Sequence, residues 1–335
     1  MHALDYGKQP CPFGSHRVIE PSGALPQNAW KLDNAPHPLA NEILCDVTTL
    51  NIDSASFRQI ADACADDPQA IADHILATVA QRGKQHNPVT GSGGMFIGRV
   101  REIGSAIRHR TQARPGDRIA SLVSLTLTPL RIDRILDVDL ATARVRIEGQ
   151  AILFESGAFA TLPDDMPGDV ALAALDVAGA PAQVRRLAKP RDRVTIIGAD
   201  GKSGMLACAA ARERVGRRGR VIGIAPDARS DGAQLLRSHG YVDDFIALDA
   251  RNAFDLLAAF GEGRLQEADL VVNCVNVPGT EMASILCARD EGTVYFFSMS
   301  TSFTAAALGA EGMGKDVTMI VGNGYAKGHA RTALQ

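Results

Sequence analysis

The sequence feature that most constrains the fold is a glycine-rich turn that directly follows an apolar strand. Residues 194–197 (VTII) predict the strand, and Gly198, Gly201 and Gly204 come next, at the opening of a predicted helix. Glycine at these positions lets the backbone turn tightly and approach a pyrophosphate, whose charge the helix N-terminus meets. Because the spacing is GxxGxxG rather than GxGxxG, the motif alone also fits a plain strand-to-helix turn.

The segments around this turn favour the first interpretation. Strands are expected at 194–197, 220–225, 245–248, 270–275, 293–298 and 317–321, and helices at 204–215, 232–238 and 252–260. Such alternation predicts βαβ units around a parallel, doubly wound sheet. In that context we expect a dinucleotide site built from Gly198, Gly201, Lys202, Ser203 and Gly204. A P-loop is disfavoured, because GxxxxGK[ST] would need glycine where Ile196 stands.

Polar residues after the later strands are further cofactor candidates. About 20 residues beyond the glycine turn, NAD enzymes place an acidic residue against the ribose. Asp227 would favour NAD there and Arg229 would favour NADP, so the choice between the two cofactors stays open. Asn276 and Asn323 follow strands at the carboxyl edge of the predicted sheet, where they would contact the nicotinamide or its ribose. The alternative for each of these residues is an ordinary loop position.

The first half of the chain has a different pattern. Short β-rich segments are expected at 95–103, 118–125, 132–138 and 145–153, with a turn at 114–117. A helix is predicted from Pro68, with Asp67 as its N-cap and Gly83 beyond its end. The stretch 84–94 (KQHNPVTGSGG) must be an irregular loop, and functional residues concentrate on such loops. This half therefore predicts a β-barrel with helical insertions.

Composition excludes several classes of protein. The 35 Lys and Arg residues against 38 Asp and Glu leave a net charge of −3, with no long block of one sign, so we expect no nucleic-acid partner. The six cysteines form no CxxC pair and no zinc-ligand spacing. Since no apolar stretch reaches 18 residues and no signal peptide is evident, we expect a cytoplasmic protein without a membrane partner.

The order of a β-barrel domain and then a Rossmann domain resembles the medium-chain dehydrogenase/reductase superfamily. The matching landmarks are residues 97–104 (IGRVREIG), 114–119 (RPGDRI) and 157–167 (GAFATLPDDMP). The resemblance implies an α/β fold, with an N-terminal GroES-like β-barrel and a Rossmann doubly wound parallel sheet. It implies a substrate domain at 1–170, a dinucleotide domain at 171–325, and a C-terminal segment, 326–335, that could return to the first domain.

Other segments resemble one family in particular, the L-erythro-3,5-diaminohexanoate dehydrogenases. They are residues 51–57 (NIDSASF), 82–94 (RGKQHNPVTGSGG), 122–130 (LVSLTLTPL), 152–157 (ILFESG) and 198–204 (GADGKSG). The resemblance implies oxidative deamination of a small diamino acid at C3 with NAD or NADP, as in lysine fermentation. The products would be 5-amino-3-oxohexanoate and ammonia. It also implies a homodimer.

The expected site is metal-free. Zinc-dependent relatives in the superfamily carry a cysteine after the early strand, a Gly-His-Glu before a barrel strand and a third ligand near the domain junction. The corresponding stretches here read DSAS at 53–56, GSGG at 91–94 and LDV at 175–177. Neither a histidine nor a thiolate ligand remains among them, and two carboxylates do not make a zinc site.

Amine chemistry suggests which residues act. An alkyl ammonium, with a pKa of roughly 10.4 by analogy with lysine, must lose a proton before hydride transfer, whereas nearby carboxylates keep it charged. Binding and deprotonation should therefore involve different residues. We expect Asp53, Asp176 and Glu155 to bind ammonium groups, His86 to accept the proton, and Asn87 and Ser54 to orient the groups.

Each of these assignments has a structural alternative. Asp53 could simply cap the helix that follows it, and His86 could be a hydrogen-bonded loop residue. Lys84 is a second candidate base, or a partner for the substrate carboxylate. At the level of the whole protein, the alternatives are a zinc-free NADPH quinone or enoyl reductase, which should have an apolar pocket, and a dinucleotide-binding protein without catalysis.

Overall fold

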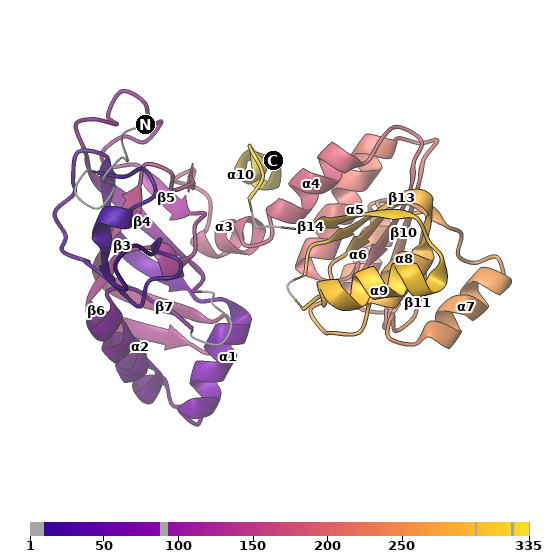
Figure 1. The fold of residues 1–335 in the computed structure, drawn as a ribbon, viewed down its shortest axis with the longest axis horizontal. Helices are drawn as coiled ribbons and strands as arrows, with labels where there is room; N and C mark the ends of the chain where they lie inside the picture. The colour runs from indigo at the N-terminus through magenta and orange to yellow at the C-terminus, as the bar shows by residue number, and fades with distance from the viewer. Residues whose placement is uncertain (1–9, 88–92, 299, 323–324, 335) are drawn as a thin grey trace. The chain divides into compact units, whose positions relative to one another are not determined.

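The computed structural model describes residues 10–87, 93–298, 300–322 and 325–334, without the side chains of residues 54 and 55. The chain divides into two compact units, residues 1–172 and 173–335 (Figure 1).

The first unit is built on a six-stranded antiparallel sheet. Its strands are β3 (Glu42–Asn51), β4 (Met95–Ile103), β5 (Arg118–Ser121), β6 (Leu130–Asp139), β7 (Arg144–Phe154) and β8 (Phe159–Thr161). They lie in the order β6-β7-β3-β4-β5-β8, with the long strand β3 between β7 and β4. The predicted strand 118–125 was too long at its end. It stops at Ser121, because Ser124 caps a 3₁₀ turn, η2 (Leu125–Leu127), through the backbone N–H of Thr126.

Two helices complete the first unit. α1 (Ser54–Ala63) packs against α2 (Pro68–Arg82), which packs against β6. The predicted ends of α2 are confirmed: Asp67 accepts a hydrogen bond from the backbone N–H of Gln69, Pro68 is the first helical residue, and Gly83 ends the helix with φ of 68°. These ends follow from local chemistry. An N–H at the first helical position has no partner within the helix, so proline, which lacks one, costs nothing there, and glycine tolerates the left-handed conformation at the other end.

The N-terminal segment is held by one buried ion cluster. It contains η1 (Ser15–Arg17), β1 (Val18–Glu20) and β2 (Lys31–Leu32), the last two paired antiparallel. The fully buried Glu42 carboxylate accepts hydrogen bonds from His16 Nε2 at 2.7 Å, from Arg17 Nε at 2.9 Å and from the Leu39 N–H at 2.7 Å. Burial by itself would raise the pKa of Glu42, but the hydrogen bonds from His16, Arg17 and Leu39 outweigh it and lower the pKa from 4.5 to about 2.

We expect Glu42 to make stability depend on acid pH. Since the folded pKa lies below the unfolded one, the contribution is full above pH 4.5 and is lost as the pH falls from 4.5 towards 2; it amounts to about 3 kcal/mol. Glu42→Gln should therefore lower the thermal unfolding midpoint clearly at pH 7 and much less at pH 3. Asp33→Asn is the control, because its half-exposed carboxylate lies 3.4 Å from Arg17 and should matter little. If Glu42→Gln lowered the unfolding midpoint equally at pH 7 and pH 3, the lowered pKa of Glu42 would not be the source of this stability.

The second unit is a parallel six-stranded sheet. Its strands are β9 (Arg193–Ile197), β10 (Arg220–Ala225), β11 (Asp244–Ala247), β12 (Ala268–Asn273), β13 (Ala288–Phe296) and β14 (Val317–Val321). All neighbours are parallel, in the order β11-β10-β9-β12-β13-β14. The strand order reverses between β9 and β12, which is where a doubly wound sheet opens a crevice for its ligand. The predicted doubly wound parallel sheet is confirmed.

Helices cover both faces of this sheet (Figure 1). The described helices from residue 168 onward are α3 (Gly168–Leu175, which begins in the first unit), α4 (Gly179–Leu187), α5 (Lys202–Val215), α6 (Asp231–Ser238), α7 (Ala253–Gly261), α8 (Glu281–Cys287), α9 (Phe303–Met313) and α10 (His329–Leu334). Val194 and Ile196 of β9 belong to a core shared with α4 and α5, whereas Ile197 belongs to a second core shared with α7, α8 and α9. α10 packs against α4, within the second unit. Within the described ranges, no helix is long and apolar enough to cross a membrane.

Candidate active site

Asp53 lies directly beyond the end of β3 and caps α1. Its Oδ1 accepts a hydrogen bond from the Ser56 N–H at 3.1 Å, so the capping role considered from the sequence is present. Its Oδ2 is buried and has no hydrogen-bond partner among the described residues. Capping thus uses one carboxylate oxygen and leaves the second available to a ligand. Ser54 is the first residue of α1, and its side chain is outside the described part of the structure.

His86 lies in the loop after α2, close to two cations. Burial lowers the pKa of His86 from 6.5 to about 4, and the charges of Lys84 and Arg82 lower it further in the same direction. The imidazole is therefore uncharged at neutral pH. Its Nδ1 is buried without a partner in the described ranges, so it can accept a hydrogen bond.

Lys84 is buried rather than exposed. Its Nζ donates a hydrogen bond to the Pro26 carbonyl at 2.8 Å, and burial, followed by the charge of Arg82, lowers the pKa of Lys84 from 10.5 to about 8. The Arg82 guanidinium lies over the Trp30 ring, 3.8 Å from its centroid. These two cations make the potential around His86 positive.

Asn87 connects this loop to α1. Its Nδ2 donates a hydrogen bond to Gln59 Oε1 at 2.7 Å, and the Asn87 side chain is buried. Since Asp53 caps the same helix, α1 joins the Asp53 end of β3 to the loop that carries His86. The structure therefore brings Asp53, His86 and Asn87 to one region of the first unit.

Two successive glycines bring further polar groups to the same region. A Cβ at Gly94 would lie 2.0 Å from the carbonyl oxygen of Asn51, two residues before Asp53. A Cβ at Gly93 would lie 2.8 Å from the Gln85 carbonyl oxygen and 2.7 Å from the Thr126 N–H nitrogen. Only glycine permits these approaches. Gln85 and Thr126 are buried, and Gln85 Oε1 and Thr126 Oγ1 have no partner among the described residues. We did not anticipate these two from the sequence, where the only signal was their place in polar, glycine-flanked stretches.

Glu155 is not brought together with Asp53 and His86. Because β3 and β7 are antiparallel, with Phe154 opposite Glu42, Glu155 follows β7 at the start of β3, and Asp53 lies beyond its far end. The Glu155 carboxylate instead forms an ion pair with Arg110 at 2.7 Å. Asp176 belongs to the second unit, where its carboxylate lies 3.8 Å from Lys202 Nζ at the opening of α5.

The glycine turn has the geometry of a phosphate site. Gly198 follows β9 with φ of 78°, and a Cβ at Gly204 would lie 2.0 Å from the Gly198 carbonyl oxygen, so each needs glycine. A Cβ at Gly201 would meet only that oxygen, at 3.7 Å, which leaves open space at the helix start. Gly201 is the N-cap of α5, and no side chain caps it. The N–H groups of Lys202 and Ser203 thus begin a helix with room for an anion.

The predicted ribose contacts follow β10. Asp227 accepts a hydrogen bond from the Arg229 N–H at 2.8 Å, and the Arg229 side chain is 92 % exposed. A second carboxylate belongs to this loop region, because Asp200 Oδ2 accepts a hydrogen bond from Ser230 Oγ at 3.0 Å. The sequence pattern alone does not indicate Asp200 or Ser230 as site residues.

The turn after β12 completes this edge of the sheet. Asn276 is exposed and accepts a hydrogen bond from Ser300 Oγ at 3.1 Å. Burial raises the pKa of Cys274 to about 12, although a hydrogen bond with the Ser203 side chain acts in the opposite direction. That bond links the start of α5 to the end of β12. Asn323 lies outside the described residues.

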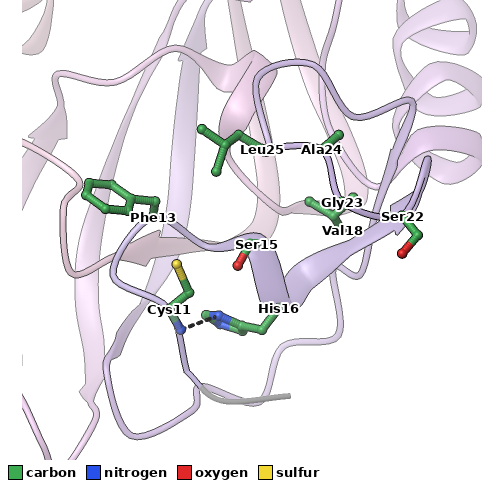
Figure 2. Close-up of a pocket in the computed structure, with 9 residues that line it drawn as sticks. All are labelled: Cys11, Phe13, Ser15, His16, Val18, Ser22, Gly23, Ala24 and Leu25. Carbon is green, nitrogen blue, oxygen red and sulfur yellow. Dashed lines mark hydrogen bonds between the residues drawn. The ribbon is translucent and has the colours of Figure 1, made fainter. Parts of the chain in front are cut away.

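Two cavities in the first unit contain none of the predicted site residues. One, of about 450 Å³, is lined by the N-terminal segment from Cys11 to Leu25, where the Cys11 N–H donates a hydrogen bond to His16 Nδ1 (Figure 2). The other, of about 320 Å³, is lined by β-sheet residues such as Thr49, Arg144 and Asp139. Within the described ranges, no three His, Cys, Asp or Glu side chains gather in a way that could hold a metal.

An antiparallel sheet followed by a doubly wound parallel sheet is also the arrangement of known solved structures. The Escherichia coli quinone oxidoreductase complexed with NADPH matches with a TM-score of 0.55 at 17 % identity, covering 90 % of this chain and 79 % of that one. Such low identity shows the fold alone, which is the medium-chain dehydrogenase/reductase fold.

Sequence comparison is more specific. A family model described as the L-erythro-3,5-diaminohexanoate dehydrogenase N-terminal domain matches residues 16–163. The L-erythro-3,5-diaminohexanoate dehydrogenase of Acetoanaerobium sticklandii is 55 % identical, covering 97 % of this chain and 94 % of the relative. The L-erythro-3,5-diaminohexanoate dehydrogenase of Fusobacterium nucleatum is 53 % identical, covering 98 % of this chain and 95 % of the relative. The chain therefore belongs to the L-erythro-3,5-diaminohexanoate dehydrogenase family.

Proposed function

We propose that this chain catalyses the oxidative deamination of L-erythro-3,5-diaminohexanoate at C3, with release of 5-amino-3-oxohexanoate and ammonia. The observation that carries the proposal is identity above 50 %, over nearly the whole chain, to two proteins named for this dehydrogenase activity. The candidate site supports it, since Asp53, Gln85, His86 and Thr126 all offer polar atoms without partners in the described part of the chain. A quinone or enoyl reductase would need an apolar pocket instead.

The second unit fits a nicotinamide dinucleotide. Gly201, Lys202 and Ser203 would hold its phosphates, because Gly201 leaves open space at an uncapped helix N-terminus. Asp227 would accept hydrogen bonds from the ribose hydroxyls, and Asn276 would contact the nicotinamide side. We infer a preference for NAD, since the carboxylates of Asp227 and Asp200 in this loop region would repel the extra phosphate of NADP. When bound, the dinucleotide would supply the acceptor for a hydride from C3, and hydrolysis of the oxidised substrate by water would give the ketone and ammonia.

In the first unit, we propose that Asp53 Oδ2 binds the reacting C3 ammonium and that His86 Nδ1 accepts a hydrogen bond from the same ammonium. An uncharged imidazole can take a hydrogen bond from the ammonium without adding to the positive charge. With a pKa of about 4, His86 is too weak a base to keep the proton, which would pass to solvent water. Lys84 and Arg82 would help, because cations that lower the pKa of His86 also lower that of a bound ammonium. Asn87 would position the loop through Gln59.

The test is reduced-nicotinamide formation by the purified protein, with NAD and NADP in separate reactions. L-erythro-3,5-diaminohexanoate is compared with lysine and a simple alcohol, with and without a chelator. We expect turnover of the diamino acid alone, with one ammonia released per reduced nicotinamide, a lower KM for NAD, and no loss with the chelator. Dinucleotide binding without turnover would instead favour the non-catalytic alternative.

We also propose that the chain forms a homodimer. The apolar strand β14 is at the edge of the parallel sheet, and Val321 at its end is 55 % exposed. An edge of this kind offers unpaired backbone groups to a second copy. The mass in solution should then be twice the 35.5 kDa of one chain, and the mass of a single chain would contradict the proposal.

A further inference from the structure

The first unit concentrates unsatisfied polar atoms in one place. Among the described residues, seven buried oxygen or ring-nitrogen atoms of side chains lack a hydrogen-bond partner: Asn41 Oδ1, Asp53 Oδ2, Gln85 Oε1, His86 Nδ1, Thr126 Oγ1, Thr195 Oγ1 and Tyr295 Oη. Buried polar groups in folded proteins nearly always have partners, so each exception needs an explanation. Four of the seven belong to the candidate active site, and the proposed reaction there has so far used only two, Asp53 Oδ2 and His86 Nδ1.

The two unused atoms belong to segments that meet at Gly93. The Cβ position of Gly93 is 2.8 Å from the Gln85 carbonyl oxygen and 2.7 Å from the Thr126 N–H nitrogen, so these two backbones are neighbours. The next residue, Gly94, approaches Asn51 and Ile52, directly before Asp53. Since Gly93 and Gly94 are consecutive, with Cα atoms about 3.8 Å apart, the backbone segments that carry the two sets of acceptors meet here. His86 and Gln85, also adjacent, join the two sets.

We propose that Gln85 and Thr126 bind the second, non-reacting ammonium of the substrate and thereby select a 1,3-diamine over a monoamine. This inference rests on the proposed function and names residues that determine its substrate. The substrate carries ammonium groups on C3 and C5, two carbon–carbon bonds apart, which suits two sets of acceptors on segments that meet at consecutive glycines. With Asp53 and His86 assigned to the C3 group, Gln85 Oε1 and Thr126 Oγ1 remain for the C5 group.

The chemistry of the two side chains fits this role. An ammonium has three N–H donors and no acceptor, and both the amide oxygen of Gln85 and the hydroxyl of Thr126 can accept from it. Both atoms are shielded from water. Hydrogen bonds to a charge are strongest in such a buried environment, and a substrate without that charge would leave the two acceptors unpaired. Neither side chain is charged, so they add no negative charge that would keep the neighbouring C3 ammonium protonated.

The experiment compares kcat/KM for 3,5-diaminohexanoate with that for 3-aminohexanoate, which lacks only the C5 amine. In the unmodified protein we expect a strong preference for the diamine. Thr126→Val and Gln85→Leu should each reduce that preference about tenfold or more, mainly because KM rises more for the diamine than for the monoamine. Thr126→Ser keeps the hydroxyl and should keep the preference.

Thr128→Val is the matched control. Thr128 is also buried, two residues away, but its Oγ1 already donates to the Ser124 carbonyl at 2.9 Å. This variant should lower the unfolding midpoint and leave the diamine preference unchanged. Thr126→Val should instead reduce the diamine preference and leave the unfolding midpoint nearly unchanged, because removing a hydroxyl without a partner costs the free protein little stability.

The outcomes separate the two hypotheses. No turnover of the diamine by the unmodified protein would overturn the proposed function and this inference with it. Turnover of the diamine, with a preference that Thr126→Val and Gln85→Leu leave intact, would overturn the inference alone. An equal loss of activity on both substrates would show that the two residues support the fold of the loop and do not recognise the C5 amine.

Discussion

An Asp53→Asn variant is expected to keep its fold and to lose roughly 10- to 100-fold in kcat/KM for the diamino acid, because one charge-assisted hydrogen bond to ammonium disappears. The fold should survive because asparagine caps a helix about as well as aspartate, and Oδ1 can still accept from the Ser56 N–H. The substitution therefore separates the two roles of Asp53. The measurements are steady-state kinetics and the unfolding midpoint of the same preparation.

Asp67→Asn is the matched control for Asp53→Asn. Asp67 caps α2 in the same way, through the Gln69 N–H at 3.1 Å, but it is exposed and has no place in the candidate site. We expect both kinetics and stability to stay near those of the unmodified protein. If Asp53→Asn matched this control in kcat/KM, Asp53 would be a helix cap and nothing more.

A Gly204→Ala variant is expected to lose about 3 kcal/mol or more of stability in the second unit, with dinucleotide binding lost as a consequence. The added Cβ would lie 2.0 Å from the Gly198 carbonyl oxygen and 2.7 Å from the Ala199 Cα. These are backbone atoms of the strand-to-helix turn, so no side-chain rotation can relieve the overlap, and α5 must move away from β9. Thermal or urea unfolding of the free protein measures the effect without any ligand.

Gly201→Ala, three residues earlier, should behave differently. Its Cβ would meet only the Gly198 carbonyl oxygen at 3.7 Å, and Gly201 has an ordinary φ of −79°, so stability should change little. Dinucleotide affinity should fall, because the methyl group occupies the space at the start of α5 that a phosphate needs. Titration of NAD into both variants distinguishes them. A Gly201→Ala protein with unchanged affinity would place the phosphates elsewhere.

The fold was predictable because its strongest signals are local. Asp67, Pro68 and Gly83 specify the ends of α2 through capping and φ preferences that need no knowledge of distant residues. The turn after β9 is similar, since Gly198 needs a positive φ and Gly204 needs the close approach of two backbones. The end of β5 could not be predicted, because residues 122–125 are apolar enough for a strand and only the Ser124 cap shows that the chain turns there.

The candidate site was predictable only in part. Asp53 and His86 were identified because each lies in a polar stretch next to predicted elements, and the structure brings them to one region. Glu155 seemed equally suitable, but which end of the sheet it occupies depends on the antiparallel register of β3 with β7, which is a tertiary property. Gln85 and Thr126 could not be found from the sequence. They are candidates because Gln85 Oε1 and Thr126 Oγ1 are buried without partners among the described residues, and only the folded structure shows this.

The strand order of the first sheet also has a consequence for how the chain folds. β3 ends at Asn51, and one of its two neighbours, β7, begins only at Arg144, so the central strand pairs fully only after a long stretch of chain has been made. In the second unit, β9 pairs with β10 and β10 with β11, each the next strand along the chain. Contacts between distant residues slow folding, so the β9-β10-β11 part of the second sheet can form from nearby contacts, whereas the region around Asp53 must wait for its last partner strand.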